Sequence, residues 1–415
     1  MRTVTIDALR RVLSALPVAE PRVVTSGNAA THLPALAVVD EALPAYRLFL
    51  LNAPRGVPSR PGVVLETPFV GPGQRDQPGL EYLPARLSLV PSLFRTTRPP
   101  DVVLLHTSTP RAGTVSLGIE VNVLPAAVEA ARARGGLVVA VLDEHMPYTH
   151  GDAVLPVDDV DLAVEMPVGL PAPSGRAPDE TSRRIGERVA GLVPAGATLQ
   201  LGIGGVPDAT LSALAGSRGL RVFSEMISDG VLDLERQGAL DPTEPVVCSF
   251  LFGSPELYAW VADEPRVRVL RTEKTNDPAV IARQRSMTSI NSAMQVDLYA
   301  QANASRRPGG AIYSGFGGST DFIVGAMHSA GGAAVMALPS WHPRAQVSTV
   351  VELVDGPVTS FQHSALVSEQ GVAPVFGRSQ SEQARAIIDA VAHPDARDRL
   401  AEAAARRGLL AEHRS

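Results

Sequence analysis

Short aliphatic runs alternate with helical patterns along the whole chain, and this alternation restricts the folds that the chain can adopt. The runs are largely uninterrupted by polar residues, as expected for strands that are buried on both faces of a sheet. The predicted strands are 47–52, 101–107, 137–143, 198–203, 220–225, 333–339 and 364–369. The predicted helices include 125–135, 208–219 and 382–393. Strand–helix alternation predicts open, mostly parallel sheets, so the fold class is α/β.

A chain of 415 residues is too long for one ordinary core and suits two domains. Hydrophobic residues make up 45% of it and charged residues 19%, so a large core can be buried. The segment 168–180 is rich in proline, glycine and serine, and a helical pattern begins just after it. We therefore predict a first domain at 1–175 and a second at 176–415.

Charge and cysteine content exclude several classes of protein. The net charge of −6 argues against a general nucleic-acid binder, which needs a basic face. The single cysteine, Cys248, excludes a disulfide framework within the chain, and its apolar neighbours indicate a buried thiol rather than a nucleophile. The chain shows no signal peptide and no apolar segment long enough to span a membrane, so we expect a cytoplasmic protein. The histidines lack metal-binding spacing, and we expect no metal site.

Glu225 follows a predicted buried strand, in the sequence GLRVFSEMISDGVLDL. It should therefore lie at the carboxyl end of that strand, which is the edge where open α/β sheets bind ligands. The alternative is an acid that caps the next helix or pairs with an arginine. The spacing alone does not separate these two interpretations.

Two glycine loops share one pattern, in which a predicted strand leads into glycines and then into a helix. Their glycines are Gly202, Gly204 and Gly205 in the first loop, and Gly315, Gly317 and Gly318 in the second. Glycines allow the backbone to approach a ligand closely, and the N–H groups of the following helix can hold a phosphate or an oxyanion. Either loop could also be an ordinary tight turn. Neither matches the dinucleotide-binding pattern, so an oxidoreductase is a weak alternative.

Several further polar residues are candidates of lower specificity. Glu369 follows another predicted strand, and its alternative interpretation is a solvated loop acid. Asn291 and Gln295, each taken alone, are more typical of buried amides that satisfy backbone groups. His145 and His342 could act as acid–base groups, although both are more typical of loop residues.

In combination these motifs resemble the acetyl-CoA hydrolase/CoA-transferase family, which includes the 4-hydroxybutyrate, butyrate and acetate CoA-transferases. The first half contributes DVVLLHTSTPRAGTVSLG and MPYTHGD. The second half contributes TLQLGIGGVPDA, SEMISDGVLDL, INSAMQVDL, YSGFGGSTDF, SEQGVAPVFG and AHPDARDRL, in the family's order. Each motif is weak alone, but the ordered set covers nearly the whole chain.

The resemblance implies two open α/β/α domains with the active site between them. It also implies a ping-pong CoA transfer in which Glu225 attacks an acyl-CoA and passes through a mixed anhydride to a glutamyl-CoA thioester. The catalytic residues that it implies are Glu225, Glu369 and Asn291. The residues that it implies for coenzyme A are Gly202, Gly204, Gly205, Gly315, Phe316, Gly317 and Gly318. The expected partners are an acyl-CoA, a small carboxylic acid and a second copy of the chain in a homodimer.

The sequence also departs from the family pattern at four places. Gln295 replaces an acid, while Val324, Tyr148 and the Ser348–Thr349 segment stand where the family has arginines. The usual small carboxylate acceptor is therefore in doubt. An acyl-CoA hydrolase on the same site and a non-catalytic acyl-CoA-binding relative remain the alternatives to a transferase.

Overall fold

The computed structural model describes residues 1–172, 177–358 and 362–411, and its contacts divide the chain into two compact units. The first unit comprises Met1–Pro173, Pro245–Thr275 and Ile312–Gly317, and the second comprises the rest. The first unit therefore includes two segments from the second half of the chain. Within the described residues, no helix is long and apolar enough to cross a membrane.

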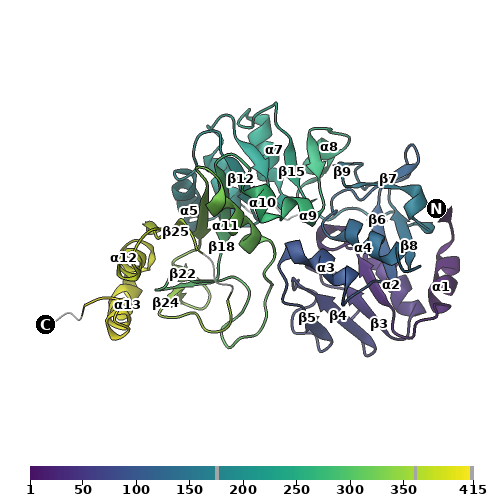
Figure 1. Ribbon diagram of the computed structural model, residues 1–415, viewed down its shortest axis with the longest axis horizontal. Helices are drawn as coiled ribbons and strands as arrows, with labels where there is room; N and C mark the ends of the chain where they lie inside the picture. The colour runs from purple at the N-terminus through teal and green to yellow at the C-terminus, as the bar shows by residue number, and fades with distance from the viewer. Residues whose placement is uncertain (173–176, 359–361, 412–415) are drawn as a thin grey trace. The chain divides into compact units, whose positions relative to one another are not determined.

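A parallel sheet forms the centre of the first unit (Figure 1), in the order β1-β11-β8-β6-β2-β3-β4-β5. Its strands are β1 (Arg2–Thr3), β2 (Arg22–Thr25), β3 (Tyr46–Phe49), β4 (Val63–Thr67), β5 (Leu80–Tyr82), β6 (Val102–Thr107), β8 (Leu137–Leu142) and β11 (Leu162–Glu165). The helices α1 (Ile6–Ser14), α2 (Leu33–Ala42), α3 (Val90–Arg95) and α4 (Leu124–Arg132) flank it. Every residue of β6 is buried, which explains its uninterrupted aliphatic sequence.

The order of these strands reverses at one point. The strands β3, β4 and β5 extend the sheet on one side of β2, whereas β6, β8 and β11 extend it on the other. The crevice outside the carboxyl ends of β2 and β6 is thus a topological switch point, where open α/β sheets bind ligands.

The first unit also contains further short strands. β7 (Thr114–Ser116) and β10 (Val154–Pro156) form an antiparallel pair, and β17 (Val267–Val269) pairs in parallel with β15 (Val246–Cys248) and with β9 (His150–Gly151). The helices α8 (Pro255–Val261) and α9 (Thr272–Thr275) belong to the same unit.

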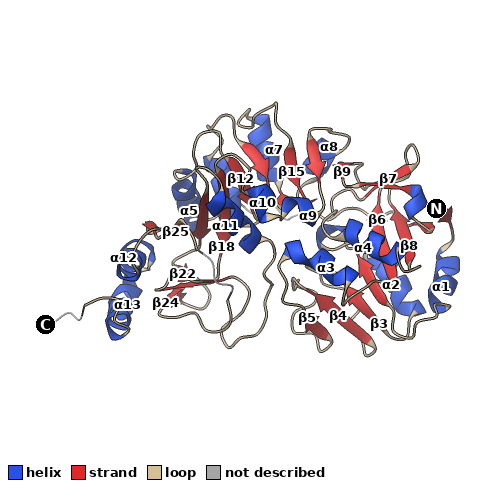
Figure 2. Ribbon diagram, in the orientation of Figure 1, coloured by secondary structure: helices blue, strands red, loops and turns tan. Residues whose placement is uncertain are grey.

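The sheet strands of the second unit follow one another in the order β26-β25-β21-β18-β12-β13. Its strands are β12 (Thr198–Leu201), β13 (Arg221–Phe223), β18 (Met287–Ser292), β21 (Ala333–Ala337), β25 (Ala365–Val367) and the antiparallel edge strand β26 (Val372–Pro374). Its main helices are α5 (Glu180–Ala190), α6 (Gly205–Ala213), α7 (Asp229–Arg236), α10 (Pro278–Ile281), α11 (Ser319–His328), α12 (Gln380–Ala386) and α13 (Pro394–Arg406). Figure 2 shows helices beside the strands of this unit as well. The strand order reverses between β12 and β18, which places a second switch point there.

All seven strands named from the sequence are present, and so are the three named helices. The helix expected over 382–393 changes after Ala386 into a π-helical turn over Ile387–Val391. The strand expected before the second glycine loop is wrong. Residues 311–314 form no strand, because this segment bonds to loops of the first unit: Ser314 accepts from the Val70 N–H, and Gly315 bridges to Phe69.

Candidate functional site

Glu225 lies two residues beyond the end of β13, as the sequence predicts. Strands β13 and β12 are parallel, so the Gly202–Gly205 loop that follows β12 lies at the same edge of the sheet. Glu225 is half-buried, while its neighbours Ser224 and Met226 are buried. The fold of the second unit therefore presents one carboxylate at the ligand-binding edge of its sheet.

Two donors hold the carboxylate of Glu225. The Asn276 amide nitrogen Nδ2 donates to Oε2 at 2.8 Å, and the backbone N–H of Gly318 donates to the same carboxylate. Asn276 is fully buried and directly precedes the N-cap of α10, while Gly318 is the N-cap of α11. A Cβ on Gly318 would lie 1.7 Å from Oε2 of Glu225 and 2.1 Å from Nδ2 of Asn276. Only glycine fits at this position.

The environment of Glu225 shifts its acidity in two directions. Burial raises the pKa of Glu225 to about 7, and the nearby carboxylate of Asp321 adds to this rise. The hydrogen bonds from Asn276 and Gly318 act against it because they favour the charged form. The carboxylate is therefore held in place and titrates near neutral pH, which is typical of functional groups.

The first glycine loop keeps open space around its backbone. A Cβ on Gly202 or Gly204 would meet no atom within 4 Å, so packing does not explain either glycine. Gly204 has a φ of +122°, which L side chains rarely adopt. Gly205 begins α6, and a Cβ there would lie 2.8 Å from Oγ of Ser182. The loop thus offers accessible backbone and a helix N-terminus beside the strand that precedes Glu225.

The second glycine loop divides between the two units. Gly315, Phe316 and Gly317 belong to the first unit, whereas Gly318 belongs to the second. A Cβ on Gly315 would lie 2.2 Å from the Pro68 carbonyl oxygen, and the Gly317 carbonyl accepts from the Leu87 N–H at 3.0 Å. Packing within the first unit accounts for these two glycines. Of the loop's four predicted residues, Gly318 is the one for which the structure gives a hydrogen bond to Glu225.

Glu369 follows β25 and is held by a different set of groups. Its carboxylate accepts from the Ser340 N–H at 2.9 Å, from the Ser340 hydroxyl and from the Gln370 amide at 3.2 Å. In the described part of the chain, none of its hydrogen bonds comes from Glu225 or Asn276. Glu369 therefore lies at the carboxyl end of a strand in the same sheet, but no hydrogen bond given by the structure joins it to Glu225.

Asn291 lies on β18 inside a polar cluster. Its Nδ2 donates to Oγ of Ser289 at 2.8 Å and to Oε1 of Gln200 at 3.3 Å, and Ser289 also donates to Gln200. This cluster bridges β12 and β18 at the switch point of the second sheet. Asn291 is thus tied to neighbouring strands, and its proposed catalytic role remains a prediction.

The departures from the family pattern have ordinary local contacts. Gln295 on β19 (Gln295–Asp297) accepts from Asn303 at 3.4 Å, and Oγ1 of Thr349 donates to the Pro339 carbonyl at 2.5 Å. In the first unit, the Tyr148 hydroxyl lies 2.6 Å from Oγ1 of Thr114, and the Arg111 guanidinium lies over the Tyr148 ring. Val324 is a half-buried residue of α11.

Asn276 and Asp321 were not identified from the sequence. Asn276 is 51 positions from Glu225, and its only local signal is the Asn-Asp-Pro that opens α10. Asp321 occupies the first turn of α11, where an acid is also explained by the helix dipole. Both signals are common in helices that have no functional site, so neither pointed to Glu225.

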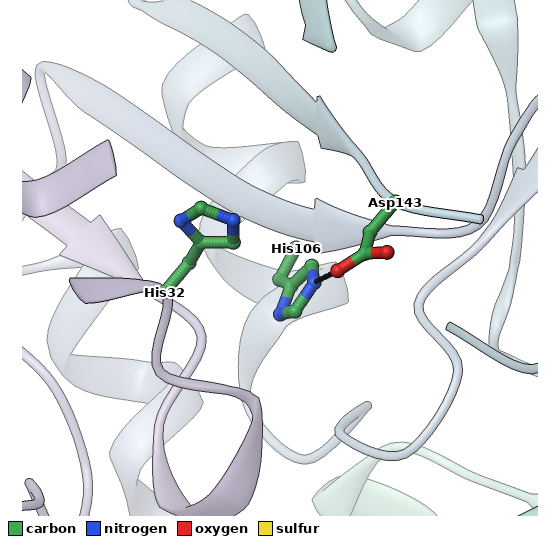
Figure 3. A group of neighbouring side chains, drawn as sticks. All are labelled: His32, His106 and Asp143. Atoms are coloured by element: carbon green, nitrogen blue, oxygen red, sulfur yellow. Dashed lines mark hydrogen bonds and ion pairs between the residues drawn. The ribbon is translucent and has the colours of Figure 1, made fainter. Parts of the chain in front are cut away.

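A buried group of His32, His106 and Asp143 lies at the carboxyl ends of β6 and β8 in the first unit (Figure 3). The Nε2 of His106 is 3.0 Å from Oδ2 of Asp143, and its Nδ1 is 3.1 Å from the Ala30 carbonyl. The Nδ1 of His32 accepts from the Ala35 N–H. These side-chain types could ligate a metal, but each ring nitrogen already has a hydrogen-bond partner.

Asp143 is the centre of that group. Burial alone would raise its pKa, but hydrogen bonds from His106, His145 and the Val168 N–H hold the pKa well below its usual range. The exposed ring of His145 bonds Oδ1, while His106 and Val168 bond Oδ2. Asp143 therefore connects the end of β8 to His106 on β6 and to the backbone at Val168.

Comparison with known proteins identifies the family. The acetyl-CoA hydrolase/transferase N-terminal domain matches residues 74–169, and the C-terminal domain of the same family matches residues 253–404. The 4-hydroxybutyrate coenzyme A transferase of Clostridium kluyveri is 38% identical over 80% of each chain. The acetyl-CoA hydrolase of Saccharomyces cerevisiae is 34% identical over 48% of this chain and 38% of its own.

Solved structures agree with the sequence comparison. The crystal structure of a 4-hydroxybutyrate CoA-transferase from Porphyromonas gingivalis superposes with a TM-score of 0.82 at 30% identity, covering 98% of each chain. The fold is therefore that of the CoA-transferases, as expected from the order of the motifs. With two matched domains and a 38% identical relative over four-fifths of its length, the chain belongs to the acetyl-CoA hydrolase/transferase family.

Proposed function

We propose that this protein is an acyl-CoA:carboxylate CoA-transferase that works through a covalent glutamyl-CoA thioester on Glu225. The proposal rests on the hydrogen bonds and the raised pKa of that carboxylate. One oxygen is bound by the Asn276 amide, the Gly318 N–H donates to the same group, and the pKa is raised to about 7. A carboxylate with a raised pKa is the more basic, and so the stronger, nucleophile.

In the proposed mechanism the two carboxylate oxygens of Glu225 have different roles, and the hydrogen bond from Asn276 supports this distinction. Because Asn276 holds Oε2, Oε1 is the oxygen that attacks the thioester carbonyl carbon. The carbon–sulfur bond breaks, coenzyme A leaves as a thiolate, and an acyl-glutamyl anhydride remains. The thiolate then attacks Cδ of Glu225, and the bond from Cδ to Oε1 breaks. The released carboxylic acid carries Oε1 away, and Oε2 becomes the carbonyl oxygen of the glutamyl-CoA thioester.

The second step places negative charge on Oε2 as the thiolate adds to Cδ. The Asn276 amide already points at this oxygen, and the Gly318 N–H donates to the same carboxylate. Preorganised donors of this kind stabilise the developing charge without moving, and loss of one typically costs about 10²–10³ in kcat. An acceptor acid completes the cycle by the reverse steps.

The decisive experiment is intact-mass spectrometry after incubation with an acyl-CoA. Wild-type protein should gain the mass of a coenzyme A thioester, and Glu225→Gln should not. Addition of an acceptor acid should discharge the adduct and form a new acyl-CoA if the protein is a transferase. Discharge by water alone would identify the hydrolase, and binding without an adduct would identify a non-catalytic relative.

Hydrolysis stays the second candidate because of the residues at the family's arginine positions. Tyr148 and Thr349 are engaged in local hydrogen bonds, and Val324 has no polar group, so none of the three supplies a cation for an acceptor carboxylate. The cytoplasmic location remains a prediction from the sequence, and the homodimer remains a prediction from the resemblance. Light scattering on the purified protein tests the second of these.

A further inference from the structure

Three neighbouring strands of the second unit bring Asn291, Gly202 and Glu225 into one row. Strand β12 pairs in parallel with β18 on one side and with β13 on the other. Continued by one residue, the β12–β18 register places Gly202 opposite Asn291. Continued by three residues, the β12–β13 register places Gly202 opposite Glu225. Adjacent strands lie about 4.8 Å apart, so Asn291 and Glu225 are about 10 Å apart in the row, with one glycine between them.

The side chains of Asn291 and Glu225 belong to the same face of the sheet. Residues opposite each other in parallel strands point to one face, and the residues before and after them point to the other. In agreement with this, Leu201 and Ser224, which precede Gly202 and Glu225, line one small cavity together. A Cβ on Gly202 would meet no atom within 4 Å. The row therefore consists of two polar side chains with open space over the glycine between them.

Gln200 lies two residues before Gly202 on the same face of β12, and it was not identified from the sequence. Gln200 is 4% exposed, and its Oε1 accepts from Oγ of Ser289 at 2.6 Å and from Nδ2 of Asn291 at 3.3 Å. Nδ2 of Asn291 also donates to Oγ of Ser289, so both of its N–H groups are engaged. Among the described residues, the amide nitrogen of Gln200 and the amide oxygen of Asn291 have no hydrogen-bond partner, and neither is sealed from solvent. The two bonded amides thus offer one donor and one acceptor beside the open space.

A secondary amide is the ligand group that satisfies both of these atoms. Its carbonyl oxygen accepts from the Gln200 N–H, and its own N–H donates to Oδ1 of Asn291. A carboxylate or a phosphate carries acceptors only, so it would leave Oδ1 of Asn291 facing another acceptor. In coenzyme A, an amide nitrogen is joined to the sulfur through two methylene groups. With the sulfur at Cδ of Glu225, this amide falls over Gly202 and beside Asn291.

We propose that Gln200 and Asn291 bind the amide of coenzyme A that is nearest to the sulfur, over the open space at Gly202. The inference rests on the proposed CoA-transferase function, which supplies coenzyme A as the ligand and places its sulfur at Glu225. Every coenzyme A thioester carries this amide, so the pair recognises the carrier and not the acyl group. It therefore distinguishes coenzyme A from thiols that lack the amide, and it holds the sulfur beside Glu225 whichever acid is transferred.

Calorimetry with coenzyme A itself tests this pair without any covalent step. The full-length protein is titrated with coenzyme A and with an analogue in which an ester oxygen replaces the N–H of this amide. Wild type should bind coenzyme A about tenfold more tightly than the analogue, because the ester leaves Oδ1 of Asn291 without a donor. Asn291→Ala should bring this ratio close to one. Gln200→Met should weaken both ligands about tenfold and preserve the ratio, since both ligands keep the carbonyl oxygen.

Ser292→Ala is the matched control, because Ser292 follows Asn291 on β18 but is exposed and belongs to the opposite face. It should leave both affinities unchanged. Equal affinities of wild type for the two ligands would overturn the inference without any variant, even where Asn291→Ala fails to fold. A ratio that survives Asn291→Ala would overturn it as well. If the ratio behaved as expected but wild type formed no covalent adduct with an acyl-CoA, the proposed function would fail instead.

Discussion

Replacing Gly318 by alanine should disable Glu225, the proposed nucleophile, without removing its side chain. The new Cβ would lie 1.7 Å from Oε2 of Glu225 and 2.1 Å from Nδ2 of Asn276, whereas real Cβ atoms essentially never approach another heavy atom within 3.0 Å. The carboxylate or the start of α11 must therefore shift by more than an ångström. A displacement of that size at a reacting group costs about 10²-fold in rate. This corresponds to about 2.7 kcal/mol of activation free energy.

Single-turnover mass spectrometry measures this effect directly as the rate at which the coenzyme A adduct appears. Gly216→Ala is the matched control, because a Cβ there meets no atom within 4 Å and its φ is not positive. The control should retain the wild-type rate, and thermal unfolding should show that both variants fold. If Gly318→Ala formed the adduct within about threefold of wild type, the contact between the N-terminus of α11 and Glu225 would not be part of the catalytic geometry.

Further predictions concern acidity, stability and the acceptor. The rate of adduct formation should rise with pH and level off above about 7, because the proposed nucleophile is the ionised form of Glu225, whose pKa is raised to about 7. Asp321→Asn should move this midpoint to lower pH, and an unchanged profile would contradict the assignment. The pKa of Glu225 is higher in the folded state than in the unfolded state. The group therefore contributes stability at a pH below its unfolded-state pKa, and this contribution is lost as the pH rises through about 7. Glu225→Gln should therefore raise the melting temperature at pH 8 more than at pH 5 in thermal unfolding scans. Acetate should be a poor acceptor, since Val324 and Tyr148 cannot bind a carboxylate as arginine does, and acetate rates that match those of the best other acid would refute this.

The strands could be predicted well from the sequence because buried strands appear in it as continuous apolar runs. A strand such as β6, whose six residues are all buried, can be built only from apolar or hydrogen-bonded residues. Glu225 could be placed for the same reason, since it comes just after such a strand. A residue at the carboxyl end of a buried strand in an open parallel sheet lies at the ligand edge, whatever the rest of the chain does.

The partners of Glu225 could not be predicted in this way, because they come from distant segments. Asn276 precedes a four-residue helix and looks like any residue before an N-cap. The role of the glycines in the second loop could not be predicted for a related reason. Its first glycines are required by close packing against Pro68 and Phe69 in the first unit, and a local pattern does not distinguish such packing from ligand binding.

The acidity of Glu225 shows why a site of this kind is a property of the fold rather than of a motif. Burial alone would leave the carboxyl protonated and unreactive at neutral pH, whereas hydrogen bonds alone would lower its pKa and weaken it as a nucleophile. The observed environment combines the two, with burial and Asp321 raising the pKa and with Asn276 and Gly318 favouring the charge. Asn276 precedes α10, whereas Gly318 and Asp321 both lie at the start of α11. The same Ser-Glu-Met sequence on another surface would have an ordinary carboxyl group, because the raised pKa of Glu225 depends on the residues at the starts of α10 and α11.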